Sequence, residues 1–306
     1  MKVTVIGANG QLGSDLVCEW RIADSEWRMA DGEWRVVPLT HADIEVEDYE
    51  SVREALGKHR PDCVINTAAF HDVIACEAQP ERAFAVNAVG AWNVARVCAE
   101  LGATLVHLST DYVFDGGKGR PYVEDDLPRP SNVYGVSKLA GEHLIRYTLA
   151  QHFVVRTSGL YGAHPCRAKK GENFVGFMLR LARERGEVRV VTDEVLTPTY
   201  TLDLARQVAL LAQTEYHGLY HATSGGECSW YEFARAIFDL TGTQVSLQPT
   251  TAGEFPRPVK RPAYSVLENR ALQELGLDRM RPWREALEAY LKEREAGWKI
   301  ELGTRV

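Results

Sequence analysis

The sequence lacks an excess of positive charge and a long apolar run, and we expect no leader segment. Its 306 residues carry a formal net charge of −7, which gives no electrostatic footprint for nucleic acid or an anionic membrane surface. Apolar runs such as 63–65 and 188–191 fall far short of the roughly 20 residues of a bilayer-spanning helix. The N-terminus enters a strand pattern without the apolar stretch and cleavage site of a signal peptide. We therefore expect a cytoplasmic protein with neither nucleic-acid nor membrane partners.

Paired cysteines are also missing. The six cysteines form no CxxC pair and are scattered along the chain: Cys18, Cys63, Cys76, Cys98, Cys166 and Cys228. This spacing suggests neither a disulfide framework nor a zinc site, so we expect reduced thiols and no metal.

Short β-rich runs alternate with helical stretches up to about residue 157, which is typical of parallel βαβ units. The predicted strands are 2–6, 35–39, 62–66, 104–108 and 153–156, and the spacing of apolar residues predicts crossover helices over 81–101 and 134–148. The expected fold class is α/β, a Rossmann-type doubly wound parallel sheet with a smaller C-terminal α/β lobe.

The regular alternation ends near Gly159. We expect residues 1–157 to form the first domain, with 192–217 returning to it, and residues 158–191 and 218–306 to form the smaller lobe. A cleft between the two is the expected binding site. A near duplication, 25–28 and 32–35, lengthens the link before the second strand and is interpreted as a surface hairpin.

A glycine-rich segment follows the first strand and opens a helix. Gly7, Gly10 and Gly13 are spaced as GxxGxxG, with Gln11 and Leu12 between the last two. Glycines let the backbone turn tightly and approach a pyrophosphate, and the helix N-terminus offers free N–H groups and the positive end of its dipole. The first domain is therefore predicted to bind NAD(P), which leaves the smaller lobe to bind the substrate.

The choice between NAD(H) and NADP(H) depends on the residues at the end of the second strand, where an acid would bind the ribose 2′-hydroxyl of NAD(H). This chain has Thr40 and His41 there and no acid. The missing acid favours NADP(H). No arginine follows to grip a 2′-phosphate, so NAD(H) is also compatible. Thr40 and His41 are candidate contacts. Asp43 and Ile44 could flank the adenine, and the alternative for Asp43 is an exposed loop aspartate.

Tyr134 and Lys138 stand four residues apart at the start of a predicted helix, which puts both side chains on one face. An ammonium beside a phenol lowers the pKa of the phenol, so Tyr134 becomes a usable proton donor. Lys138 can also hold the nicotinamide ribose. Earlier in the chain a strand ends at Ser109 and Thr110, and Thr110 is our candidate for polarising a carbonyl. The predicted catalytic residues are Thr110, Tyr134 and Lys138.

These motifs resemble those of the extended short-chain dehydrogenases/reductases, specifically the dTDP-4-dehydrorhamnose reductases, over nearly the whole chain. The matching segments are 10–13, 43–44, 66–69, 77 with 80–81, 87, 109–116, 132–142, 156–158, 197–199, and 261–262 with 265 and 267. The resemblance implies hydride delivery to the C4 ketone of a nucleotide-linked sugar by the triad above, and a homodimer is a family expectation. It also implies cofactor contacts at Gln11, Leu12, Asp43, Ile44, Ala68 and Ala69.

The chain departs from this family at two places that bear on the sugar. Gly159 stands where these reductases commonly have a tryptophan that packs on the sugar, so we expect a wider pocket. His71 and Ile74 replace a small hydroxyl residue and an aspartate, and His71 either contacts substrate or caps a loop. The candidate substrate contacts are His71, Tyr112, Gly159 and Arg261. Two basic clusters could hold a diphosphate: Arg167, Lys169 and Lys170, and Arg257, Lys260 and Arg261.

Three other functions share parts of this pattern. Sugar-nucleotide 4,6-dehydratases follow the strand-end threonine with Asp and Glu, whereas this chain reads Thr110, Asp111, Tyr112, which favours ketone reduction over elimination. A 4-epimerase uses the same Tyr/Lys pair and stays open. A non-catalytic NADP-binding subunit, resembling the regulatory beta subunit of methionine adenosyltransferase, also stays open, and a partner protein with absent turnover would reveal it.

Overall fold

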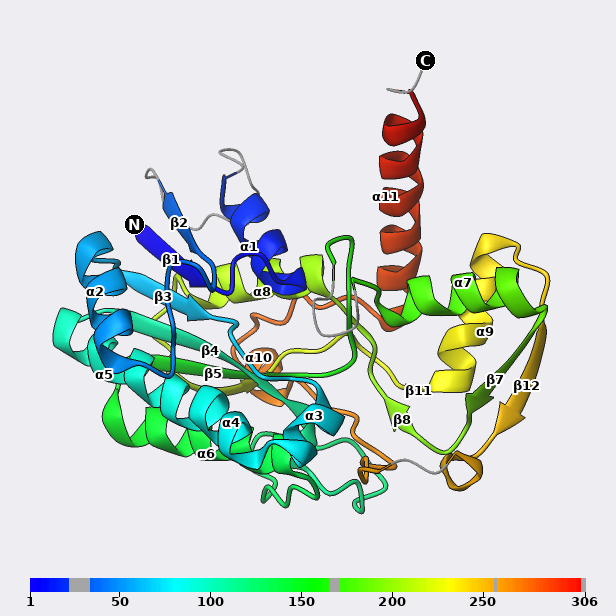
Figure 1. Ribbon diagram of the computed structural model, residues 1–306, viewed down its shortest axis with the longest axis horizontal. Helices are drawn as coiled ribbons and strands as arrows, with labels where there is room; N and C mark the ends of the chain where they lie inside the picture. The colour runs from blue at the N-terminus through cyan, green and yellow to red at the C-terminus, as the bar shows by residue number, and fades with distance from the viewer. Residues whose placement is uncertain (22–33, 166–170, 256–257, 304–306) are drawn as a thin grey trace.

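The computed structural model describes residues 1–21, 34–165, 171–255 and 258–303, and a parallel sheet of six strands forms its centre (Figure 1). The strands lie in the order β10-β5-β4-β3-β1-β2, and each neighbouring pair is parallel. Their bounds are Lys2–Ile6 for β1, Arg35–Leu39 for β2, Cys63–Asn66 for β3, Thr104–Thr110 for β4, His152–Thr157 for β5 and Gly218–His221 for β10. The predicted doubly wound sheet is confirmed, because β2 and β3 lie on opposite sides of β1.

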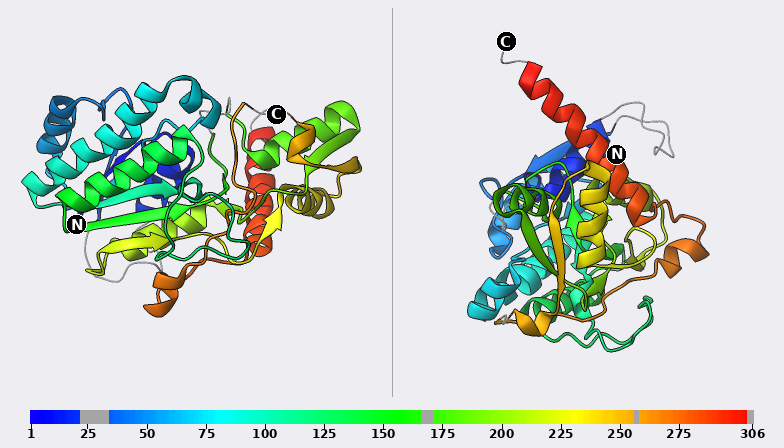
Figure 2. Two further views of the ribbon diagram at one scale, coloured as in Figure 1. Left: turned by 90° about the horizontal axis from the view of Figure 1, so that it is seen from below. Right: turned by 90° about the vertical axis from the view of Figure 1, so that its right-hand side faces the viewer.

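Helices cover both faces of this sheet (Figure 2). α1 (Gln11–Arg21) and α8 (Thr201–Leu211) share one core with Val3 and Val5 of β1. α2 (Tyr49–His59), α5 (Ala91–Leu101) and α6 (Val133–Thr148) surround a second core that contains Val64 of β3 and Val154 of β5. Successive strand residues point to opposite faces, so buried strands with apolar residues on both sides feed both cores.

The helix predicted over 81–101 is present but irregular. It consists of α4 (Pro80–Phe84), a π-helical turn (Ala85–Gly90) and α5. Asn87 in the π turn is buried; it accepts the N–H of Phe70 at 2.8 Å and donates to Ser137 Oγ on α6 at 3.0 Å. The turn thus fixes the segment that follows β3, including α3 (Val73–Ala78), against α6.

One predicted boundary is wrong. We expected residues 218–306 to lie in the smaller lobe, but Gly218–His221 form the edge strand of the main sheet, paired with Phe153–Arg156 of β5. α10 (Arg270–Glu274) lies beside this strand, and its Leu272 joins the core of α1 and α8. Pairing with β5 buries Tyr220 and His221, and a run of four residues is too short to show a strand period in the sequence.

The remaining elements form a smaller unit beside the carboxyl ends of the strands (Figure 1). Its core includes Tyr161, Val175, Phe233, Ile237 and Leu287. Its helices are α7 (Phe174–Arg185), α9 (Trp230–Thr241) and α11 (Trp283–Gly303). Short 3-10 turns lie at Ala252–Glu254 and, directly after β4, at Asp111–Val113. Its two-stranded sheets are β12 (Ser246–Thr250) with β7 (Glu187–Val191), β11 (Cys228–Ser229) with β8 (Val195–Leu196), and β6 (Leu160–Tyr161) with β9 (Thr199–Tyr200).

The described cysteines are free thiols: Cys18, Cys63, Cys76, Cys98 and Cys228. Burial raises the pKa of Cys63 and of Cys76 to about 12, so both stay protonated at neutral pH. Cys166 and residues 25–33 of the near-duplicated segment lie outside the described residues. Within the described ranges, no helix combines the length and apolarity needed to cross a membrane.

A buried ion pair joins α6 to the sheet. Glu142 on α6 accepts from Arg156 Nε and Nη2 of β5 at 3.0 and 2.6 Å, and from the Ser109 hydroxyl of β4. The Arg156 and Glu142 side chains are 2% and 1% exposed. A buried charge is tolerated where its partner and its hydrogen bonds are in place, so this pair constrains the position of α6.

Arg156→Met should destabilise the fold, because it leaves the Glu142 carboxylate buried without its counter-ion. We expect the free energy of unfolding, measured by urea titration at neutral pH, to fall by about 3–5 kcal/mol. Adding Glu142→Leu to this variant should recover part of the loss. Arg180→Met at the exposed Arg180–Glu184 pair of α7 is the control and should leave stability unchanged within error. Equal losses at both sites would contradict a special role for the buried pair.

Candidate active site

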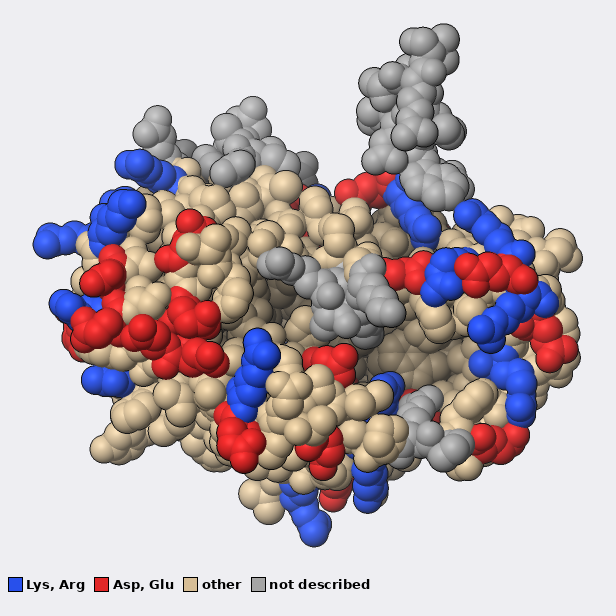
Figure 3. Space-filling view, in the orientation of Figure 1, with Lys and Arg blue, Asp and Glu red and all other residues tan. Residues whose placement is uncertain are grey.

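A cleft of about 710 Å³ opens between the sheet and the smaller unit, and Figure 3 shows the surface hollowed there. Residues that follow β1, β3 and β4 line one side. Phe174, Leu196 and Trp230 of the smaller unit line the other. The chain order reverses between β1 and β3, and open α/β sheets bind ligands at that point.

The structure brings together all but one of the predicted site residues. The cleft is lined by Gly7, Gly10, Gln11, Leu12, Gly13, Thr40, His41, Ile44, Ala68, Ala69, His71, Thr110, Tyr112, Tyr134, Lys138, Gly159 and Arg261. Asp43 is the exception. Its carboxylate accepts the backbone N–H and the hydroxyl of Thr40, both at 2.8 Å, and the backbone bond in particular lowers the pKa of Asp43. The Asp43 side chain thus caps the turn after β2, and its expected contact with the cofactor stays a prediction.

The glycine-rich segment forms a tight turn between β1 and α1. A Cβ atom on Gly13 would lie 2.2 Å from the carbonyl oxygen of Gly7, so no larger residue fits where α1 passes the turn. The Gly7 N–H donates to Leu39 O of β2 at 2.9 Å. α1 begins at Gln11, and its first residues line the cleft. This cradle and the free N–H groups of the helix N-terminus fit the pyrophosphate of a dinucleotide.

Gln11 also connects the turn to the smaller unit. Its Nε2 donates to the carbonyl oxygens of Gly162 and His164 at 3.3 and 3.2 Å. Asn173, the N-cap of α7, donates to the same Gly162 oxygen at 2.7 Å. The two sides of the cleft are therefore held together at the start of α1.

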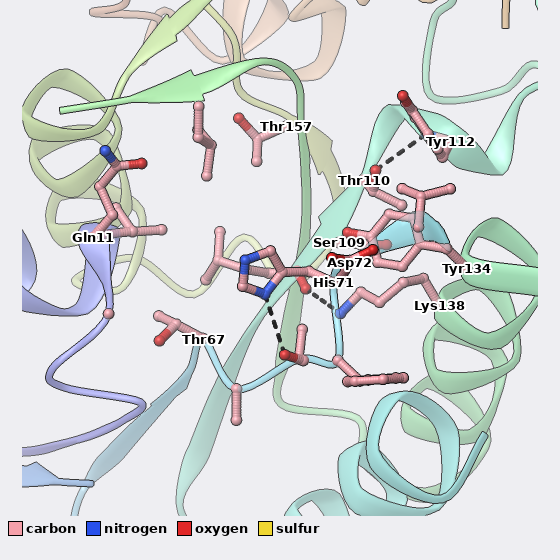
Figure 4. Close-up of a pocket in the computed structure, with 18 of the residues that line it drawn as sticks. Gln11, Thr67, His71, Asp72, Ser109, Thr110, Tyr112, Tyr134, Lys138 and Thr157 are labelled. Carbon is pink, nitrogen blue, oxygen red and sulfur yellow. Dashed lines mark hydrogen bonds between the residues drawn. The ribbon is translucent and has the colours of Figure 1, made fainter. Parts of the chain in front are cut away.

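Thr110, Tyr134 and Lys138 form a group apart from Gln11, and Figure 4 shows His71 between them and Gln11. Thr110 ends β4, and Tyr134 and Lys138 belong to the first two turns of α6. Asn132 caps this helix by accepting the N–H of Gly135 at 2.9 Å. The cap fixes the start of α6, so the tyrosine and the lysine face the strand end.

Burial dominates the electrostatics of the catalytic residues. It raises the pKa of Tyr134, and a hydrogen bond with the Thr110 side chain opposes the rise. We expected the charge of Lys138 to lower that pKa, but burial raises it and the side chain that opposes the rise is Thr110. Lys138 itself is 1% exposed; its Nζ donates to Leu108 O at 2.6 Å. Burial lowers the pKa of Lys138 to about 8. Tyr134 is therefore protonated at neutral pH, as a proton donor must be.

Asp111 is a cleft residue that we did not predict. It is buried, and its carboxylate accepts from the Thr110 hydroxyl at 3.1 Å and from the Ser158 hydroxyl at 2.8 Å. Burial raises its pKa, and side-chain hydrogen bonds from Ser265, Ser158 and Thr110 oppose the rise. The signal in the sequence was its place directly after Thr110. Asp111 holds the Thr110 hydroxyl in a fixed orientation beside Tyr134.

An aromatic pair in the smaller unit was also missed. The rings of Phe174 and Trp230 lie 4.4 Å apart between centroids, and both line the cleft. Ser229 and Glu232 form a capping box that starts α9 at Trp230. That capping pattern places Trp230 at a helix start, but nothing in the sequence shows that α7 brings Phe174 beside it. The pair offers an apolar aromatic surface on the side of the cleft formed by the smaller unit.

A wider pocket at Gly159 stays a prediction, although neighbouring residues approach this glycine closely. Gly159 has φ +56°, and a Cβ atom there would lie 2.8 Å from Leu196 Cδ1 and 3.1 Å from Pro198 Cα. Leu196 of β8 fills the space beside the glycine. His71 is exposed and its Nδ1 lies 3.3 Å from Ala69 O. Of the basic clusters, Arg261 lines the cleft, whereas Arg167, Lys169, Lys170 and Arg257 lie outside the described residues.

A parallel sheet with a glycine turn at its reversal point, and a Tyr/Lys pair beside a strand-end threonine, together define an NAD(P)-dependent oxidoreductase. The particular family follows from comparison with known proteins. The family model described as RmlD substrate binding domain matches residues 1–296. This chain belongs to that family, which lies within the extended short-chain dehydrogenases/reductases.

Individual relatives match along most of their length. The chain is 43% identical over 295 residues to spore coat polysaccharide biosynthesis protein SpsK of Bacillus subtilis, which covers 96% of this chain and 98% of that protein. It is 39% identical to dTDP-4-keto-6-deoxy-D-glucose reductase of Streptomyces niveus, covering 92% and 94%. The crystal structure of dTDP-4-dehydrorhamnose reductase from Bacillus anthracis in complex with NADP is 37% identical, with a TM-score of 0.88 and coverage of 95% and 99%.

The lowered pKa of Lys138 predicts a pH-dependent stability difference. The fold disfavours the ammonium, so Lys138 opposes folding below about pH 8, and this penalty vanishes as the pH rises past the value of an unfolded lysine. Lys138→Met removes the penalty. The advantage of the variant in free energy of unfolding should therefore shrink by roughly 3 kcal/mol between pH 7 and pH 10.5.

Urea titrations at the two pH values measure this change. Lys292→Met on α11 removes an exposed lysine and should give a difference from wild type that does not depend on pH. A Lys138→Met difference that is equally constant would contradict the lowered pKa.

Proposed function

We propose that this protein uses NADPH to reduce the C4 ketone of a nucleotide-linked 6-deoxy-4-ketohexose, and that the substrate is dTDP-4-dehydro-L-rhamnose, which becomes dTDP-L-rhamnose. One observation carries the proposal: Thr110, Tyr134 and Lys138 lie together in the cleft that the glycine turn also lines (Figure 4). A dinucleotide held by that turn can reach the proton donor across the cleft.

The residues of this chain supply the proton and the orientation. When bound, the nicotinamide supplies the hydride to the ketone carbon. The ketone oxygen gains negative charge in this reduction, and Tyr134 Oη gives it a proton. The Thr110 hydroxyl donates to Asp111 in the free protein, and it would polarise the ketone by turning this proton toward the ketone oxygen. Lys138 would hold the cofactor ribose beside this phenol.

Support for NADPH comes from the end of β2, where no acid follows Leu39. The Bacillus anthracis relative is described in complex with NADP. Glu45 lines the same part of the cleft and lies 3.4 Å from His41 Nε2. A protonated His41 would suit the 2′-phosphate of NADP(H), whereas the Glu45 carboxylate would suit the 2′-hydroxyl of NAD(H). We therefore propose NADP(H) as the cofactor and NAD(H) as a tolerated one.

Support for the sugar comes from two relatives and from the lining of the cleft. The Streptomyces niveus protein is named for a 4-keto-6-deoxy sugar and the Bacillus anthracis protein for a 4-dehydro sugar, both linked to dTDP. In this chain Arg261 offers a cation for a diphosphate, and Phe174 and Trp230 offer an apolar surface for a base or sugar ring.

Two alternatives receive less support. Elimination of water would need a second carboxylate after Asp111, and Tyr112 stands there. The intact set of Thr110, Tyr134 and Lys138 favours catalysis over a regulatory subunit. The proposal further places the enzyme in the cytoplasm, and a homodimer is proposed from the family alone.

Tyr134→Phe tests the proton donor. It removes the phenol and keeps the ring, so NADPH binding should change little while turnover of dTDP-4-dehydro-L-rhamnose falls by about 10²–10⁴-fold. The readouts are loss of NADPH absorbance and identification of the sugar product. Tyr147→Phe, at an exposed position on the same helix, is the matched control and should retain full activity. Wild-type rates in Tyr134→Phe would contradict the role of Tyr134, and tight NADPH binding without turnover by the wild type would contradict the proposed substrate.

A further inference from the structure

His107 lies buried behind the catalytic lysine, and the mechanism above does not use it. It stands on β4 opposite Asn66 of β3 in the parallel register. His107, Asn66 and Lys138 are each 1% exposed. His107 Nε2 lies 3.0 Å from Lys138 Nζ, and its Nδ1 lies 3.3 Å from Asn66 Nδ2. These contacts connect the segment after β3 to the lysine.

The orientation of Asn66 decides which nitrogen of His107 carries a proton. Asn66 Oδ1 accepts the N–H of Ala68 at 3.0 Å, so the NH₂ group of Asn66 faces the ring. An NH₂ group only donates, and Nδ1 must therefore be unprotonated. Burial holds the pKa of His107 well below its ordinary value. The ring is neutral, and its single proton is on Nε2.

The Nε2–H group points at Lys138 Nζ. An ammonium has no lone pair and would meet this group donor to donor. An amine accepts the bond from His107 and still donates to Leu108 O at 2.6 Å. Glu142, the carboxylate that favours the ammonium, is already paired with Arg156 at 2.6 Å. The hydrogen-bond pattern therefore fits the uncharged lysine.

We propose that Asn66 and His107 hold Lys138 as an amine in the cofactor-free enzyme at mildly alkaline pH, and that dinucleotide binding converts Lys138 to the ammonium with net uptake of one proton from solvent. The inference rests on the proposed function, because it requires the dinucleotide to bind beside Ala68. The Nε2–H bond of His107 breaks as its proton passes to Lys138 Nζ, and the proton from solvent forms a new N–H bond on Nδ1, so the net uptake is one proton. The ammonium then donates to His107 Nε2, the ring carries its proton on Nδ1, and Asn66 turns its oxygen toward the ring.

This second arrangement explains the coupling to the cofactor. When Asn66 turns, the Ala68 N–H loses its acceptor, and Ala68 lines the cleft. A cofactor oxygen that accepts this N–H in place of Asn66 stabilises the turned state. The negative charge of the dinucleotide phosphates also favours the ammonium. Binding of the cofactor and charging of the lysine therefore support each other.

Calorimetric titration of the full-length protein with NADPH, in two buffers of different ionisation enthalpy, measures the proton uptake. The 2′-phosphate of NADPH is fully ionised at about pH 8.5 and contributes none. With the pKa of Lys138 near 8 in the free protein, uptake at that pH should be roughly three-quarters of a proton per site. Lys138→Met should abolish it.

Two variants test the chain of contacts. His107→Leu removes the Nε2–H donor, so more of the lysine is charged before binding, and uptake should fall about threefold. Asn66→Asp puts an acceptor opposite Nδ1 and fixes the charged arrangement in advance, so uptake should fall to about zero. Gln151→Glu adds the same charge at an exposed site before β5, at the strand end away from the cleft, and should keep the wild-type uptake.

The outcomes separate the two proposals. Failure of the wild type to bind NADPH would contradict the proposed function. NADPH binding without proton uptake, or uptake that persists in Lys138→Met, would overturn this inference and leave the proposed function standing. Unchanged uptake in both His107→Leu and Asn66→Asp would remove these residues from the account.

Discussion

The contact of α6 with the ends of β4 and β5 is the constraint on which the catalytic site depends. Glu142 and Arg156 form a buried ion pair across this contact, and Lys138 donates to the Leu108 carbonyl oxygen one turn earlier on the helix. A shift of α6 along the sheet would separate buried charges, which is far more costly than the loss of an exposed ion pair. Tyr134 therefore keeps a fixed height above the end of β4.

Burial gives the site its chemical character. The proposed catalytic residues are largely removed from water, and this burial raises the pKa of Tyr134 and of Asp111 while it lowers that of Lys138. The hydrogen bond with Thr110 opposes the rise at Tyr134 but does not outweigh burial. The acid is made weak enough to hold its proton until charge develops on a nearby oxygen.

Local patterns in the sequence were sufficient for the elements that depend on local physics. The strands 2–6 and 35–39 have the predicted bounds, and the helix predicted from residue 134 begins at Val133. The glycine spacing and the Tyr/Lys spacing are local as well, and the cleft unites them. Features that depend on distant contacts could not be found in this way. β10 forms because it pairs with the free edge of β5. The π turn is stabilised by the hydrogen bond that Asn87 donates to Ser137 on α6.

Gly159 illustrates a limit on how this cleft can evolve. Its positive φ and the 2.8 Å approach of Leu196 Cδ1 mean that a side chain added at 159 strains the backbone and displaces the Leu196 side chain. The effect of a substitution at 159 therefore depends on the residue at 196, so the two positions are epistatic.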